Sequence, residues 1–580
     1  MTLARSPFAD PRRWTGCGVA WALSCGLLLA LPAPDPEAGV GQWYSVLPPL
    51  LAILLAIFFQ HLFVSLGAAV VLGAFLAYGP LPWIALPRGF ETFIWANLSS
   101  GFNLSILAFT LTLIGMVQIV SRSGAAQALV QALFGAARSG RTTRLGTALA
   151  GVVFFFDDYA NSVVLGTTMR PMTDRWRISR EKLAYVVDST SAPVAGLALI
   201  STWIAYEVGL LNDIAADLNL GLDGYAIFLL LLPLRFYCLT TLVFVVCNAI
   251  VGRDFGPMYR AEVRALRDGK VLRDGARLLT SRTLEDARPA THRLPPWSHA
   301  VWPVAALVVA AVGGMLWLGA GAIEAAGVPF SVFDPTVWRL AFGAVGGSAA
   351  GSGQVLFMAA LVGTSLALGL AVSQRFLTLS EGLTAWTRGI ALVWPAVLIL
   401  ILAWAMKSIA DVLHTDVFLA ALLGGRVSPL SVPLVTFGLA AGIAFATGTS
   451  WGTMGIVLPL AVPLAYSLSD GQTAGPIVWL TAAAVLDGAI FGDHCSPISD
   501  TTILSATASG CDPLDHVWTQ APYALTCMLL AGLAGYCGVA WGLPVWAAYA
   551  LLMGGTLAVL FVAGRPLPSP PSHLSRRSEP

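Results

Sequence analysis

Stretches of apolar residues, each about twenty residues long, recur along the chain and are separated by short polar segments. An α-helix of about twenty residues is long enough to cross the hydrocarbon core of a bilayer. The pattern therefore predicts an all-α polytopic membrane protein with about twelve spans.

Composition supports this class and excludes others. Hydrophobic residues make up 57% of the 580-residue chain and charged residues only 11%, whereas soluble domains carry about a quarter charged residues. The net charge of +1 says nothing about nucleic acid, and we expect no nucleic-acid partner. His494, Cys495, Cys511 and His516 do not have the spacing of a structural zinc site.

Orientation follows from the basic residues, because basic loops stay in the cytoplasm. This rule predicts a multi-pass protein of the inner (plasma) membrane with both termini cytoplasmic. We interpret residues 1–40 as a cytoplasmic tail and a retained first span rather than a cleaved signal peptide. The basic zones are Arg5–Arg13, Arg122–Arg144, Arg170–Lys182, Arg253–Arg293 and Arg565–Arg577.

One segment is too short for the crossings that its flanks require. Arg144 and Arg170 both belong to cytoplasmic zones, yet two crossings between them would need about 40 residues. We therefore predict a re-entrant hairpin near residues 145–172, with its turn at Phe156–Ser162. Irregular backbone at that depth is tolerated where it is buried in protein or lines a watery cavity.

The second half of the chain repeats this pattern. Aligning Pro193 with Pro497 superposes two polar, proline-containing segments, and aligning Pro171 with Pro459 places Asn161 over Thr449. An inverted repeat of this kind places a transport site near the membrane midplane. The predicted units are a first repeat at 41–250 with a broken helix at 183–210, a cytoplasmic loop at 251–297, a second repeat at 298–564 with a hairpin near 432–468 and a broken helix at 475–507, and a cytoplasmic tail at 565–580.

Polar residues inside these apolar segments are the candidate site. A carboxylate at mid-membrane depth costs several kcal/mol, so such residues usually have a role. Carboxylate, hydroxyl and carbonyl oxygens suit a small, hard cation, and we expect Asp158 and Asp493 to be direct cation ligands. The candidates for cation or proton binding are Asp158, Asn161, Asp188, Asp493 and Asp500. Further substrate-binding candidates are Asp157, Ser189, Thr190, Thr449, Ser450, His494, Ser496 and Thr501.

Other polar and aromatic residues have plainer explanations. Asp174 and Asp512 are expected in surface ion pairs or helix caps, and Asp223 in a loop. Trp203 and Trp451 either form part of the cavity wall or pack, and packing is the favoured explanation. His494 is either a proton carrier or a hydrogen-bonded neighbour of Asp493, and Glu207 is a weaker candidate.

Five segments resemble the NhaC family of sodium/proton antiporters, and the resemblance extends over residues 45–560. It implies an ion-transporter fold in which each repeat supplies a hairpin and a broken helix. The family also includes malate/lactate exchangers coupled to sodium and protons. The segments are Phe156-Asp-Asp-Tyr-Ala-Asn161, Met169-Arg-Pro-Met-Thr-Asp174, Ser179-Arg-Glu-Lys-Leu-Ala-Tyr185, Asp188-Ser-Thr-Ser-Ala-Pro193 and Gly492-Asp-His-Cys-Ser-Pro-Ile-Ser-Asp-Thr-Thr502.

The resulting hypothesis is an antiporter in which sodium ions and protons compete for the same carboxylates. No GxxxxGK[ST] motif is present, so an ion gradient is the expected energy source. We expect no cofactor; sodium is the transported ion, and the partners are sodium, protons and the bilayer, with a homodimer compatible with the sequence. Three alternatives stay open: a sodium- or proton-coupled transporter of a small organic anion or amino acid, a membrane enzyme and a channel.

Overall fold

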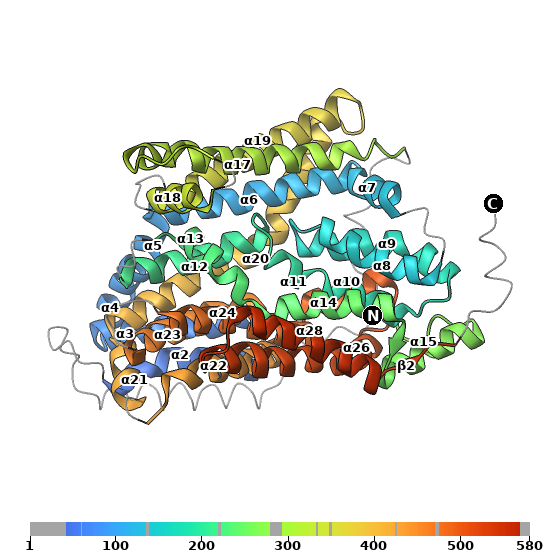
Figure 1. The fold of residues 1–580 in the computed structure, drawn as a ribbon. Coiled ribbons are helices and arrows are strands. Elements are labelled where there is room, and N and C mark those ends of the chain that lie inside the picture. Colours follow the sequence, from blue (N-terminus) through green and yellow to red (C-terminus); the bar gives the residue numbers. More distant parts are fainter. Residues whose placement is uncertain are drawn as a thin grey trace.

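The computed structural model describes residues 42–568 except 60, 135–138, 219–221, 279–292, 332–333, 347–350, 424–425 and 470–474. It is a bundle of long, roughly parallel helices (Figure 1). In the described part of the chain, nine helices are long and apolar enough to cross a membrane, or up to eleven when each sharply bent pair counts as one span. This confirms the all-α, multi-pass class. The span predicted within residues 1–40 lies outside the described residues.

The described chain begins with several helices that include a sharp bend. The segment Pro82–Ser99 bends by 114° away from α3, and α3 packs against α2 and the long helix α20 of the second repeat. These elements are η2 (Trp43–Val46), α2 (Leu47–Phe59), α3 (Leu62–Tyr78), α4 (Pro82–Gly89), the π-helical η3 (Phe90–Trp95) and α5 (Ala96–Ser99).

The first repeat contains two interrupted segments. Two short helices, α8 and α9, occupy the region of the predicted first hairpin, and the helical segment after them is interrupted around Pro193. The elements are α6 (Gly101–Arg122), α7 (Ala125–Phe134), α8 (Gly140–Val153), α9 (Asp158–Arg175), α10 (Arg180–Ser189), α11 (Ala192–Ala195), α12 (Thr202–Asp217), α13 (Gly224–Leu231) with η4 (Leu232–Leu234), and α14 (Phe236–Val251).

The second repeat has the same organisation. Helices α22 and α23 occupy the region of the predicted second hairpin, and α24 and α25 are separated by a break that contains Pro497. The elements are α17 (Ser298–Ala325), α18 (Pro335–Gly346), α19 (Gly351–Ser373), α20 (Leu379–Val412), α21 (Thr415–Leu423), η5 (Pro429–Ser431), α22 (Val432–Thr447), α23 (Ser450–Ser469), α24 (Pro476–Cys495), α25 (Asp500–Ser509), α26 (Pro513–Leu530), η6 (Ala531–Cys537), α27 (Gly538–Ala540) and α28 (Val545–Val562).

The two hairpins lie toward opposite ends of the bundle. Figure 1 shows α8 and α9 toward the right of the view and α22 and α23 toward the lower left. Both ends of the first hairpin reach the same carboxylate: Arg144 Nη1 donates to Glu262 Oε2 at 3.2 Å, and Ser179 Oγ donates to Glu262 Oε1 at 2.7 Å. Because Arg144 lies near the start of α8 and Ser179 follows α9, the chain leaves this hairpin on the side where it began.

Glu262 belongs to a short element that spans the base of the hairpin. Helix α15 (Gly256–Asp268) follows strand β1 (Arg253–Asp254), which pairs antiparallel with β2 (Arg565–Pro566) beyond the last span. Burial raises the pKa of Asp254, but the ammonium group of Lys182, 2.6 Å away, holds this pKa below its usual value overall. These contacts fix the ends of α14 and α28 on the same side as the base of the hairpin.

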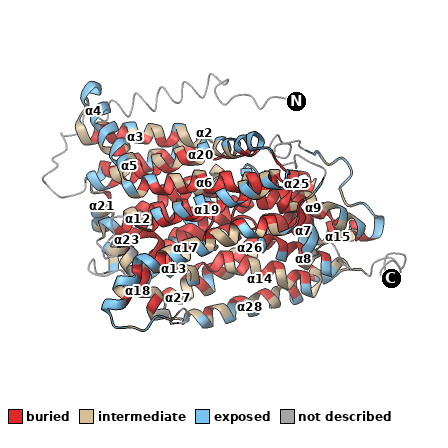
Figure 2. Ribbon diagram, turned by 90° about the horizontal axis from the view of Figure 1, so that it is seen from above, coloured by how far each residue is buried: buried red, intermediate tan, exposed pale blue. Residues whose placement is uncertain are grey.

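The second repeat supplies the most buried helix. In the most apolar 18-residue stretch of α24, 83% of the residues are buried, whereas the corresponding share is 22% in α17 and in α28. Buried residues fill the middle of the bundle (Figure 2). Glycines allow α22 and α24 to approach closely: a Cβ at Gly488 would lie 2.4 Å from Phe437 O, and one at Gly492 would lie 2.3 Å from Ala441 O. Small residues at a helix contact are typical of packing in membranes, where apolar burial alone drives little association.

The geometry of the first hairpin predicts that both of its ends face the cytoplasm. Single cysteines at the exposed positions Arg141 and Arg175, in a Cys-free background, should both react with a membrane-impermeant maleimide from the cytoplasmic side. They lie at opposite ends of the hairpin, so a single crossing would place them on opposite sides. Labelling of either position from the periplasm would contradict the hairpin. A cysteine at Ser428, just before α22, is the control and should react from the periplasm.

Candidate functional site

The hairpin turns and the helix breaks meet around one cavity of about 360 Å³. Residues from both repeats line it, together with one face of α6 and one face of α20. The polar lining residues are Gln118, Ser121, Asp157, Asp158, Tyr159, Thr202, Thr449, Ser450, Asp493, Asp500 and Thr501. The structure therefore brings together Asp158 and Asp493, which lie 335 residues apart in the sequence.

Four helices begin at this cavity, namely α9, α12, α23 and α25. Local capping explains three of these starts: Asp157 accepts a hydrogen bond from Ala160 N at 2.7 Å, Ser201 from Ile204 N at 3.2 Å, and Ser499 from Thr502 N at 3.3 Å. The N-terminus of a helix carries partial positive charge, which stabilises a nearby carboxylate. The fold thus offsets part of the cost of placing carboxylates within the membrane.

Asp493 has a different electrostatic setting from the other carboxylates. It lies in the last turn of α24, where the partial charge of the helix is negative. Its Oδ2 accepts hydrogen bonds from Ser450 Oγ at 3.4 Å and Thr501 Oγ1 at 3.2 Å. Its Oδ1 is buried and has no hydrogen-bond partner among the described residues. A cation or a proton at Oδ1 would satisfy this oxygen and offset the local negative potential.

Asp500 connects the two repeats. Its Oδ2 accepts a hydrogen bond from the hydroxyl of Tyr159, and its Oδ1 accepts one from Thr501 N at 2.9 Å. Tyr159 and Asp500 are both exposed, and both line the cavity. Sequence reasoning passed over Tyr159, although its position directly after the Asp157–Asp158 pair was a usable signal.

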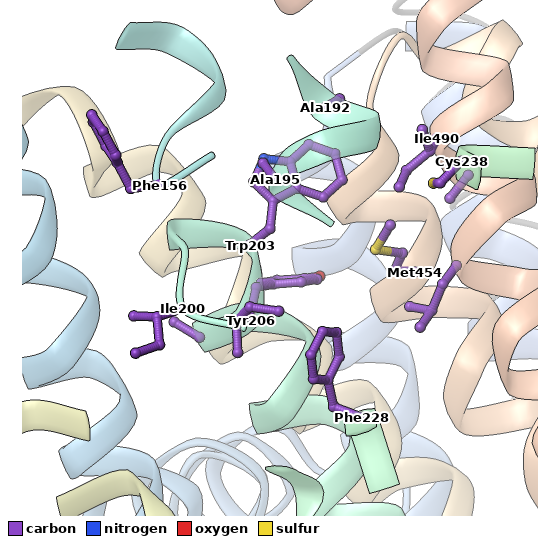
Figure 3. Close-up of a cluster of buried hydrophobic side chains, with 14 of the residues drawn as sticks. Phe156, Ala192, Ala195, Ile200, Trp203, Tyr206, Phe228, Cys238, Met454 and Ile490 are labelled. Atoms are coloured by element: carbon purple, nitrogen blue, oxygen red, sulfur yellow. The ribbon is translucent and has the colours of Figure 1, made fainter. Parts of the chain in front are cut away.

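Two tryptophans for which packing was the favoured explanation also form part of the cavity wall. Trp203 and Trp451 line the cavity with ring centroids 6.0 Å apart, and Tyr206 stacks on Trp451 at 4.5 Å. Figure 3 shows Trp203 and Tyr206 with Met454 in the buried apolar cluster that supports this wall. Both roles, packing and lining, therefore belong to the same side chains.

Six of the predicted site residues are not among those that line the cavity. All six make hydrogen bonds behind it. Asn161 Nδ2 donates to Gly151 O at 2.8 Å and Thr190 O at 2.8 Å, which ties the hairpin to the first break. Ser496 Oγ donates to Phe445 O at 2.8 Å. The six residues are Asn161, Asp188, Ser189, Thr190, His494 and Ser496.

Comparison with known proteins identifies the family. A model of the Na⁺/H⁺ antiporter family matches residues 194–539, more than half of the chain. The chain belongs to the Na⁺/H⁺ antiporter family. This confirms the family expected from the motifs and indicates a secondary transporter in a multi-pass membrane protein. The matched residues include the second hairpin and the helix break that contains Asp493 and Asp500. Asp157 and Asp158 lie before the matched residues.

Several relatives of this antiporter-family chain are known. An uncharacterised protein of Haemophilus influenzae is 31% identical over 532 residues, which cover 89% of this chain and 95% of the relative. An uncharacterised Na⁺/H⁺ antiporter of the same organism is 37% identical over 91 residues, covering 16% of this chain and 18% of the relative. The malate-2H⁺/Na⁺-lactate antiporter of Bacillus subtilis is 39% identical over 84 residues, covering 14% of this chain and 17% of the relative.

Two solved transporters share the fold. The Alcanivorax borkumensis YdaH transporter superposes with a TM-score of 0.51 at 16% identity, over 84% of this chain and 99% of its own. Neisseria gonorrhoeae MtrF superposes with a TM-score of 0.51 at 14% identity, over 87% of this chain and 98% of its own. At these identities the similarity shows a common architecture, and the YdaH transporter is itself described as having an unusual topology.

The antiporter-family chain also contains a fully buried ion triad that sequence reasoning missed. Arg235 donates from Nη1 to Glu207 Oε2 at 2.9 Å and from Nε to Asp487 Oδ1 at 2.8 Å. The second oxygen of Asp487 accepts hydrogen bonds from Tyr237 N and from Tyr536 OH, each at 2.6 Å. In the sequence, the signal for this triad was Arg235, a single arginine between two apolar helices. The triad connects α12, α14 and α24 and lies outside the cavity lining.

Several carboxylates outside the cavity have structural roles. Asp174 and Arg180 form a partly exposed ion pair at 2.6 Å, and Asp512 caps α26 through Leu514 N at 3.0 Å; both observations agree with the structural interpretation. Asp223 is not an ordinary loop residue, because it is buried and caps α13 through Ala226 N at 2.8 Å.

Proposed function

We propose that this antiporter-family protein exchanges sodium ions for protons at the cavity between α9, α12, α23 and α25. One observation carries the proposal. Asp157, Asp158, Asp493 and Asp500 line a single cavity, and no lysine, arginine or histidine is among the described residues that line it. Asp157, Asp158 and Asp493 are buried, and uncompensated carboxylates in a low-dielectric interior require either cations or protons.

The chemistry of the lining suits a hard monovalent cation. Asp493 Oδ1 is buried without a hydrogen-bond partner among the described residues, and the hydroxyls of Ser450 and Thr501 already approach the other oxygen of this carboxylate. Thr449 lies beside them in the second hairpin. Carboxylates and hydroxyls are the oxygen ligands that hard cations prefer. Because a proton and a sodium ion would use the same carboxylates, binding of one favours release of the other, which produces exchange.

A second candidate is exchange of a small organic anion coupled to sodium and protons. A neighbouring hollow of about 520 Å³ shares Gln118 with the cavity and is lined by Arg122, Glu381 and Arg388. Guanidinium groups beside the cavity favour a carboxylate-bearing substrate. The Bacillus subtilis relative carries malate and lactate according to its name. The absence of basic residues from the cavity lining itself favours the sodium/proton proposal.

Transport by the purified protein in proteoliposomes tests both candidates. With a pH-sensitive dye inside the vesicles, sodium chloride should drive proton movement, while potassium chloride and choline chloride should not. Sodium malate, lactate and arginine hydrochloride form the second panel. Proton movement that requires an organic anion would favour the second candidate, and no movement with any sodium salt would contradict the sodium/proton proposal. Protein-free vesicles give the background.

A further inference from the structure

A second group of buried titratable side chains lies behind the cavity. The carboxylate of Asp188 on α10 accepts hydrogen bonds from His516 Nε2 at 3.1 Å and Gln520 Nε2 at 2.8 Å, both on α26. From α25, Thr502 Oγ1 donates to Asp188 Oδ2 at 3.2 Å and Ser505 Oγ donates to Asp188 Oδ1 at 3.3 Å. All five side chains are buried. Apart from the histidines, the partners of this carboxylate are neutral groups that cannot supply a counter-charge.

His516 can supply that charge. Its Nε2 faces an acceptor oxygen and therefore carries the hydrogen when Asp188 is ionised. Its Nδ1 is then a lone-pair acceptor, and this atom is buried with no hydrogen-bond partner among the described residues. Addition of one proton converts the neutral imidazole to imidazolium beside the carboxylate. The pair thus has two states that differ by one proton, and the protonated state is electrically neutral.

His494 is less suited to this task. Its Nδ1 lies 2.7 Å from Tyr237 OH and its Nε2 lies 3.1 Å from Ser189 Oγ, so both ring nitrogens have partners. Its Nε2 is also 3.9 Å from Asp188 Oδ2. Among the described residues, the titratable groups that interact electrostatically with the Asp188–His516 pair are Asp493, His494 and Cys495, all near the end of α24.

Hydrogen bonds connect this pair to the cavity on two sides. Thr502 Oγ1, which contacts Asp188, also donates to Asp493 O at 3.3 Å. On the other side, the hydroxyls of Ser505, Ser162 and Ser191 form a chain with separations of 3.0 and 2.9 Å. Ser191 Oγ then donates to Asp158 O at 3.3 Å. These contacts place the pair directly behind the backbone of Asp493 on one side of the cavity and of Asp158 on the other.

We propose that Asp188 and His516 form a second proton-binding site, separate from the cation cavity, whose proton moves in exchange for sodium. The inference rests on the proposed sodium/proton exchange and adds one proton per cycle to it. When sodium occupies the cavity, His516 releases its proton to the aqueous phase and returns to the neutral imidazole. When sodium leaves, His516 takes up a proton from the aqueous phase, and the imidazolium balances the charge of Asp188. No other reactant is required.

The variant His516→Gln tests this proposal. Glutamine keeps a nitrogen that can donate to Asp188 but cannot bind a proton near neutral pH. In proteoliposomes, the variant should keep sodium-for-sodium counterflow within about twofold of wild type. Its number of protons moved per sodium should fall by one, and the dependence of exchange on pH should flatten. His299→Gln is the matched control, because His299 is buried on α17 outside this cluster, and it should leave both readouts unchanged.

Each other result overturns a distinct claim. An unchanged proton-to-sodium ratio and pH profile in His516→Gln would show that the pair carries no transported proton. Loss of sodium counterflow in the same variant would show that His516 is structural. If the wild-type protein moves no protons with sodium, the proposed function itself fails, and the second proton site fails with it.

Discussion

Replacement of Asp493 by asparagine should reduce sodium-driven proton movement to the background of protein-free vesicles. An amide offers an oxygen but can neither hold a proton near neutral pH nor neutralise a cation. The fold should survive, because the amide oxygen can still accept from Ser450 and Thr501. The amide nitrogen would replace the oxygen that has no partner among the described residues. We expect unfolding stability in detergent to stay within about 1 kcal/mol of wild type.

Two comparisons make this result interpretable. Asp158→Asn should behave in the same way, because Asp158 lines the same cavity. Asp174→Asn is the matched control, since Asp174 lies outside the cavity in a partly exposed ion pair, and it should keep most of the exchange activity. Full exchange in the Asp493 variant would remove this carboxylate from the transport site. An unstable variant with normal activity per folded molecule would instead indicate a structural role.

Replacement of Arg235 by methionine should cause the largest loss of stability. The side chains of Arg235, Glu207 and Asp487 are 0% exposed, so the change leaves two buried carboxylates without their cation. Removal of one partner from a buried ion pair costs about 3–5 kcal/mol. A large drop in the monodisperse fraction after heating in detergent, measured by size-exclusion chromatography, should report this loss.

The charge balance of the triad gives a graded comparison. Glu207→Gln should destabilise the protein less than Arg235→Met, because it leaves one guanidinium facing one carboxylate. Arg273→Met is the surface control: Arg273 is half exposed and pairs with Asp515 at 2.8 Å, and such pairs contribute about 0–1 kcal/mol. Equal stability of the Arg235 and Arg273 variants would contradict the structural role assigned to the triad.

Local sequence signals predicted many elements of the architecture. Polar residues in apolar runs marked the turn before Asp158 and the break around Pro497, because caps and prolines act on their own backbone within a few residues. The segment between Arg144 and Arg170 is too short for two spans, and this indicated the first hairpin. In the structure, both ends of this hairpin donate hydrogen bonds to Glu262. The contact of α15 with this hairpin was not predicted, because an arginine-rich loop has no periodicity that identifies its partner.

The sequence could not rank the buried carboxylates. Asp188 and Asp493 both lie beside a proline in a polar segment of an apolar helix, and both were predicted to bind the cation. In the structure, Asp188 has four hydrogen-bond donors and lies behind the cavity. Asp493 lines the cavity with one oxygen lacking a partner among the described residues. Their donors come from helices α23, α25 and α26, and no local pattern specifies such contacts.

The sequence by itself determined the membrane class, the positions of the helices and breaks, the inverted repeat and the family resemblance. These properties depend on hydrophobicity, capping and span length, which act within one helix or between adjacent helices. The tertiary structure decided which polar residues share a cavity, which carboxylates are already satisfied, and that Arg235 balances Glu207 and Asp487. These properties depend on contacts between residues that can be more than 300 positions apart, such as Asp188 with His516, and helix packing alone brings such residues together.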